Sequence, residues 1–140
     1  MDAIRRDQIR VAVAEDDHGM RRAVADTLRE QGLEVVEAVD GATLLSAIRR
    51  GGITLAITDL LMPGLAGSDV IGLCRVTGVH VPFIVVTGAP DVITTAVVGA
   101  PGVIVLRKPV AIDALLAAVA QAIGMAFTPP DSPPPDSISE

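Results

Sequence analysis

The stretch "ITLAITDLLMPG", residues 53–64, joins a short apolar run to one aspartate and then to a Pro-Gly pair. The run 53–58 is rich in β-branched residues and is almost continuously apolar, which is typical of a parallel strand covered on both faces. Asp59 follows this run directly. Open α/β sheets bind ligands beyond the carboxyl ends of their strands, so Asp59 is a candidate functional residue.

Four further runs of the same kind occur along the chain, at 9–14, 33–38, 81–87 and 102–106. Stretches of helical length separate or follow them, at 19–31, 41–50, 65–76 and 111–125. A helix over 90–100 is less secure, because "DVITTAVV" is crowded with β-branched residues that form helices poorly. This alternation predicts an α/β fold with a doubly wound parallel sheet.

The first predicted helix has a clear apolar stripe. Met20, Val24, Ala25 and Leu28 share one face, and the charged residues, Arg21 among them, are expected on the other. The last helix is expected to bury Leu115, Leu116, Val119 and Ile123, and to present an outer face of alanines that includes Ala118.

Composition restricts the class of protein. The 140 residues, 50% of them hydrophobic, favour one folded domain, and the net charge of -6 argues against sequence-independent nucleic-acid binding. With Cys74 alone no intramolecular disulfide can form, and no apolar run suggests a membrane span or a signal peptide. We therefore expect a cytoplasmic protein. The domain is expected at 8–125, and the proline-rich residues 126–140 are expected to form a disordered tail or linker.

Polar groups follow four of the five apolar runs. They are Glu15, Asp16 and Asp17 after the first, Asp59 after the third, Thr87 at the end of the fourth, and Lys108 after the fifth. Neighbouring carboxylates repel unless a cation joins them, and Mg²⁺ prefers such oxygen ligands. Lys108 is the only lysine in the chain. A metal, a hydroxyl and an ammonium together are suited to phosphoryl transfer.

Four motifs at these strand ends resemble those of the receiver domains of two-component response regulators, the CheY-like superfamily. They are "EDD" (15–17), "ITDLLMPGLAGSDV" (57–70), "FIVVTGA" (83–89) and "LRKP" (106–109). The resemblance covers about residues 8–125 and implies a flavodoxin-like five-stranded sheet of order 2-1-3-4-5. It also implies a cis bond before Pro109.

The resemblance further implies a role for each site residue. Asp59 would accept a phosphoryl group from a sensor histidine kinase or a histidine phosphotransfer protein. Glu15, Asp16, Asp59 and the Leu61 carbonyl would hold Mg²⁺, while Thr87 and Lys108 would contact the phosphoryl oxygens. A homodimer through the fourth and fifth helices is a possible assembly, with no nucleic-acid or membrane contact by this domain.

Alternatives and departures from the family pattern remain. The chain could instead be a receiver-like interaction module that phosphorylation does not control, whereas Leu61 argues against an aspartyl-phosphate phosphatase. Leu61 and Ala89 replace polar residues, which predicts slow hydrolysis of the phosphorylated form. Val105 replaces an aromatic residue, so any conformational signal is expected through residues 88–100. Asp17 is expected to cap the first helix and His18 to be a surface residue.

Overall fold

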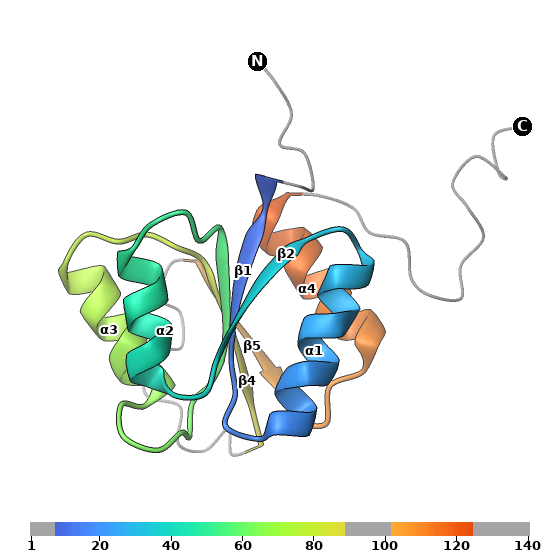
Figure 1. Cartoon of the computed structure of the whole chain (residues 1–140), viewed down its shortest axis with the longest axis horizontal. Helices are drawn as coiled ribbons and strands as arrows, with labels where there is room; N and C mark the ends of the chain where they lie inside the picture. Colours follow the sequence, from blue (N-terminus) through green and yellow to red (C-terminus); the bar gives the residue numbers. More distant parts are fainter. Residues whose placement is uncertain (1–7, 89–101, 125–140) are drawn as a thin grey trace, which may run out of the picture.

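The protein forms a five-stranded parallel sheet flanked by helices (Figure 1). A computed structural model describes residues 8–88 and 102–124. The strand order is β2-β1-β3-β4-β5, as predicted. Along the chain the elements are β1 (Arg10–Ala14), α1 (His18–Glu30), β2 (Glu34–Ala38), α2 (Gly41–Arg49), β3 (Leu55–Asp59), α3 (Gly67–Val76), β4 (Phe83–Thr87), β5 (Val103–Arg107) and α4 (Ile112–Ile123).

Two apolar clusters lie on opposite faces of the sheet. Helices α2 and α3 cover one face, and α1 and α4 cover the other (Figure 1). Successive residues of β1 alternate between them: Ala12 and Ala14 belong to the first cluster, and Val11 and Val13 to the second. Both faces of the central strands are therefore buried, which explains their continuously apolar sequences.

The predicted strands and four of the predicted helices are confirmed to within two residues at each end. The expected helix over 90–100 and the proline-rich 126–140 fall outside the described residues, as does Ala89. Asp17 caps α1 as predicted, since its carboxylate accepts a hydrogen bond of 2.8 Å from the Met20 amide. Asp40 caps α2 in the same way through Thr43. Within the described residues, no helix has the length and apolarity needed to cross a membrane.

The orientation expected for α1 is wrong at its first turn. Arg21, expected on the polar face, is only 6% exposed, whereas Met20, expected in the core, is 39% exposed. Ala25 and Leu28 are buried as predicted. Arg21 can enter the interior because polar partners receive its guanidinium there, including the Glu15 carbonyl and the Glu37 carboxylate.

The outer face expected for the last helix also needs correction. Ala118 is only 5% exposed, because α4 packs Leu115, Leu116, Ala118 and Val119 against the sheet. Ala114 and Ala117 are exposed, together with Gln121. A charged substitution at Ala118 would therefore disturb the core and could not serve as a surface probe.

Candidate functional site

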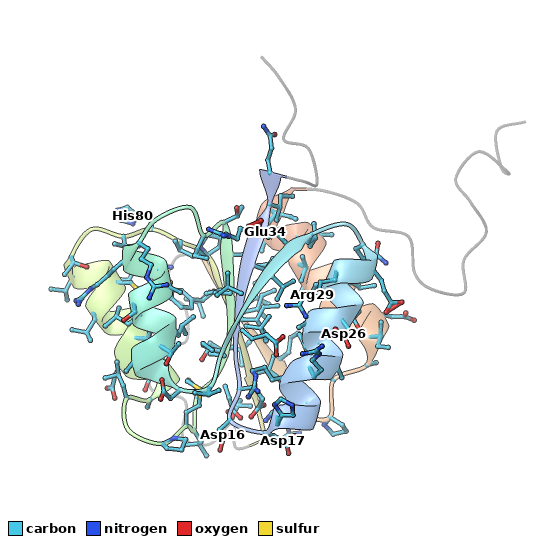
Figure 2. The ribbon with its side chains drawn as sticks, viewed as in Figure 1. Asp16, Asp17, Asp26, Arg29, Glu34 and His80 are labelled. Carbon is cyan, nitrogen blue, oxygen red and sulfur yellow. The ribbon has the colours of Figure 1, made fainter. Side chains whose placement is uncertain are left out.

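One end of the sheet gathers the charged residues of the predicted site. The strands are parallel, so their carboxyl ends share one edge. Figure 2 shows Asp16 and Asp17 at this end of the molecule, and Glu34 and His80 at the opposite end. The predicted groups that follow the strands therefore share the carboxyl edge of the sheet.

The turn after β1 carries the first acidic group. Glu15 is buried and Asp16 is exposed. The Glu15 amide donates to the Ala38 carbonyl of β2 at 3.1 Å, and Glu15 Oε2 accepts from the Asp17 amide at 3.1 Å. The Asp17 side chain accepts from the Met20 amide at the start of α1, so Glu15 and Asp16 are the two acids left for the site.

Asp59 ends β3, whose five residues are all buried. Its Oδ1 accepts from the Leu61 amide at 3.1 Å, and its carbonyl accepts from the Thr58 hydroxyl at 2.9 Å. Helix α3 begins directly against this backbone: a Cβ added to Gly67 would lie 2.2 Å from the Asp59 carbonyl oxygen. A glycine at position 67 therefore permits the close approach that fixes the strand end.

Lys108 joins the two acidic segments. Its Nζ donates to Asp59 Oδ2 at 2.6 Å and to Glu15 Oε1 at 2.9 Å. Burial alone would lower the pKa of Lys108, but the hydrogen bonds and charges of Asp59 and Glu15 outweigh it and raise the pKa. The Lys108–Pro109 peptide bond is cis, as the family resemblance implied. One ammonium thus partly neutralises two carboxylates, one just after β1 and one at the end of β3.

Glu15, Asp16 and Asp59 could hold a metal ion. One carboxylate oxygen from each lies within 4.8 Å of the other two. Mg²⁺ binds through a few carboxylates and retains several waters, so this donor set fits it. The Leu61 amide donates to Asp59, and a role for the Leu61 carbonyl as a metal ligand stays a prediction.

Thr87 lies at the same edge. It is the fully buried last residue of β4, and Asp59 pairs with its neighbour Val86 in the sheet register. The Lys108 amide donates to the Thr87 carbonyl at 2.9 Å, so the two residues are fixed relative to each other. Leu61 is 56% exposed beside Asp59, and Val105 on β5 is also exposed.

An apolar cavity of about 190 Å³ opens beside the charged cluster. Its walls come from α1, the sheet and the start of α4, including Ala23, Val24 and Leu115, and Glu15, Asp59 and Lys108 also line it. The apolar walls reduce solvation on one side of the cluster, which strengthens the interactions among these three charges.

Four contributors to the site were not singled out by the sequence. Arg21 and Glu37 support the Glu15 segment, and Thr58 and Gly67 support the Asp59 segment. Gly67 carries the only available signal, because it is a glycine in the first turn of the predicted helix 65–76, just after the Pro-Gly turn. The burial of Arg21 was not predicted, because a hydropathy pattern assigns every arginine to the surface.

The sheet order and the charged cluster at its carboxyl edge define a CheY-like receiver domain. The family model of the response regulator receiver domain matches residues 11–120, and the chain belongs to this family of two-component signal transduction proteins.

Individual relatives agree with this assignment. The chain is 36% identical over 84 residues to response regulator protein FleR of Pseudomonas aeruginosa, covering 59% of this chain and 18% of FleR. It is 33% identical over 113 residues to Nodulation protein W of Bradyrhizobium diazoefficiens, covering 80% of this chain and 50% of that protein. The chain thus spans half or less of these two relatives. A response regulator receiver protein structure from Pseudomonas putida superposes with a TM-score of 0.73 at 30% identity, covering 81% of this chain and 96% of the other.

Proposed function

We propose that the protein is a phosphorylatable receiver whose Asp59 accepts a phosphoryl group from a sensor histidine kinase or a histidine phosphotransfer protein. The observation that carries the proposal is the clustering of Asp59 with the two acids Glu15 and Asp16 beside Lys108, whose Nζ bonds both Asp59 and Glu15. A structural ion pair needs only one carboxylate for one ammonium. The additional clustered acids are suited to a site that receives a cation and then a phosphoryl group.

In the proposed reaction, a carboxylate oxygen of Asp59 attacks the phosphorus of a phosphohistidine donor. The new P–O bond forms as the P–N bond breaks, and the donor imidazole leaves with the electron pair of that bond. Lys108 Nζ, which lies 2.6 Å from Asp59 Oδ2, would neutralise a phosphoryl oxygen. Thr87 would donate its hydroxyl to another. Mg²⁺ held by Glu15, Asp16, Asp59 and the Leu61 carbonyl would supply further charge neutralisation.

The receiver is proposed to span residues 8–125 and to act in the cytoplasm, where its phosphodonor would present the histidine. The proposed homodimer would use α4 and the segment 90–100. Only α4 of these two is described, and its exposed residues include Ile112 and the small residues Ala114 and Ala117. Ala117→Glu is the appropriate probe for this surface, in place of Ala118.

The decisive experiment is chemical labelling of Asp59. The protein is incubated with Mg²⁺ and a small phosphodonor, and the adduct is located by mass spectrometry as an acid-stable, base-labile phosphoryl group. Labelling is expected in wild type and absent in Asp59→Asn. Asp16→Asn should weaken Mg²⁺ binding and abolish labelling, because one of the three clustered carboxylates is lost. A wild type that takes no label would favour an interaction module that phosphorylation does not control.

A further inference from the structure

Arg21 occupies an unusual position for a charged residue. It lies in the first turn of α1, is 6% exposed, and its guanidinium reaches the turn that carries the acidic cluster. Arginine is rarely fully buried unless it is paired. A buried cation beside a predicted cation site also opposes metal binding by simple charge repulsion. A buried arginine at this position is therefore expected to have a structural role that offsets its charge repulsion with the metal.

The hydrogen bonds of Arg21 join three segments of the chain. Nη1 donates to the Glu15 carbonyl at 2.8 Å, and Nε donates to Glu37 Oε1 on β2 at 3.2 Å. Nη2 contacts His18 Nδ1, at the first residue of the same helix. The planar fork of arginine can make these bonds simultaneously, which the single ammonium of lysine cannot do with the same geometry.

The bond to the Glu15 carbonyl is the one that bears on the site. The Glu15 carboxylate itself accepts hydrogen bonds from Lys108 Nζ and from the Asp17 amide. Fixing the Glu15 backbone therefore limits where its carboxylate, and that of the adjacent Asp16, can point. We propose that Arg21 is a positioning residue for the divalent cation, acting through the Glu15 carbonyl with Glu37 as its anchor; this inference rests on the proposed function.

Glu37 is suited to be the anchor. Its side chain is mostly covered and also receives a hydrogen bond from Arg29 Nη1 at 3.2 Å. Burial alone would raise the pKa of Glu37, but hydrogen bonds from Arg29 and Arg21, with the charges of Arg29 and Arg22, lower it. The carboxylate is therefore held in the charged form that compensates the buried guanidinium.

Positioning and charge predict opposite effects on metal affinity. If Arg21 acted only as a charge, Arg21→Gln would remove a repulsive cation and tighten Mg²⁺ binding. If Arg21 positions the turn, the same variant should weaken Mg²⁺ binding about tenfold, a typical effect of losing a residue that supports metal ligands. Arg21→Lys should also be weakened, because it keeps the charge but loses the fork.

The test is the Mg²⁺ dissociation constant of the full chain, measured by calorimetry without any phosphodonor. Arg22→Gln is the matched control: it removes the same charge from the next residue, whose side chain is 59% exposed and reaches Glu37 only at 3.8 Å, so it should not weaken binding. Leu28→Ala is the control for stability, since it destabilises the same helix away from the site. Amide chemical shifts of residues 14–17 should change in Arg21→Lys but not in Arg22→Gln.

Unchanged or tighter binding in Arg21→Gln overturns the proposal, as does an equal loss in Leu28→Ala. If Arg21→Gln does not fold, Arg21→Lys decides, and wild-type affinity in that variant overturns it. Labelling of Asp59 is scored separately. A wild type that binds Mg²⁺ but takes no label removes the proposed phosphorylation and leaves the positioning role standing. A wild type that binds no Mg²⁺ overturns both.

Discussion

Two loops bring acids to the same edge of the sheet, and they are held in different ways. The turn after β1, residues 15–17, is held by side chains: Arg21 bonds the Glu15 carbonyl, and Asp17 caps α1. The loop after β3, residues 60–66, is held by backbone approach at two glycines. A Cβ on Gly67 would meet the Asp59 carbonyl at 2.2 Å, and one on Gly41 would meet the Leu65 carbonyl at 2.0 Å.

This difference predicts different responses to substitution. A side-chain contact can be weakened by degrees, because a shorter or neutral side chain keeps part of the interaction. A backbone approach that leaves no room for a Cβ cannot be weakened by degrees, because any residue other than glycine would clash there. We therefore expect substitutions that affect the first loop to change the site by degrees. Substitutions at the two glycines should determine whether the Asp59 segment forms at all.

The largest effect is expected at Gly67. Gly67→Ala places a methyl group inside contact distance of the Asp59 carbonyl, so α3 or the strand end must move. We expect a loss of about 3 kcal/mol in the free energy of unfolding, measured by urea denaturation. Gly72→Ala in the same helix meets nothing within 4 Å and should instead stabilise the protein by about 0.5–1 kcal/mol. Equal stabilities for the two variants would contradict the backbone argument.

The next effect concerns Lys108, which connects the two loops. Lys108→Met leaves the Glu15 and Asp59 carboxylates without their shared ammonium and should cost about 2 kcal/mol of stability without Mg²⁺. Added Mg²⁺ should restore more stability to this variant than to wild type. The neighbouring Arg107→Met serves as the control and should show no such Mg²⁺ dependence.

The stabilisation that Lys108 provides by pairing with Glu15 and Asp59 should depend on pH in a defined way. The pKa of Lys108 is raised in the folded protein, so its stabilising contribution is complete below the ordinary lysine value of 10.5. It is lost as the pH rises through the higher folded value. The stability difference between wild type and Lys108→Met should therefore stay constant up to about pH 10 and shrink only above it. A difference that shrinks between pH 6 and 9 would argue against the ion pair.

A smaller effect, on rate and not on stability, is expected at Leu61. This side chain is exposed on the β3–α3 loop and offers no hydrogen bond to a water attacking the phosphoryl group. Leu61→Asn should accelerate loss of label about tenfold, or 1.4 kcal/mol. Val39→Asn, at an equally exposed apolar position on the β2–α2 loop, should leave the decay unchanged. Identical decay in Leu61→Asn and wild type would contradict the explanation.

The two loops also differ in how far the sequence predicts them. The apolar runs and the polar groups that follow them predicted the strands, the sheet edge, and the meeting of Glu15, Asp59 and Lys108, because parallel strands end together.

The residues that hold the two loops in place were harder to predict. Gly67 matters through contact with a backbone 8 residues away, and Arg21 is buried only because the Glu15 carbonyl and Glu37 are there to receive it. Hydropathy patterns describe single segments and miss such partners. Ala118 shows the same limit, since alanine suits both faces of a helix.

The smallest effect is expected at Glu37, the outermost support of the first loop. Its pKa is lowered in the folded protein, so its stabilising contribution is present above the ordinary value of 4.5 and is lost as the pH falls through the lower folded value. Glu37→Gln should therefore cost less than about 1 kcal/mol at pH 7, since the carboxylate is partly solvated. This cost should begin to shrink below pH 4.5 and disappear only below the lowered pKa of the folded protein, where wild type also carries a neutral side chain. In an Arg29→Gln background the cost at pH 7 should be smaller, because Arg29 supplies part of the interaction.

Denaturation curves from pH 3 to 7 measure each of these differences in the free energy of unfolding. A cost that stays constant over that range would mean that Glu37 acts through packing, and the graded, charge-based support inferred for the β1–α1 turn would then rest on Arg21 and the Glu15 carbonyl alone.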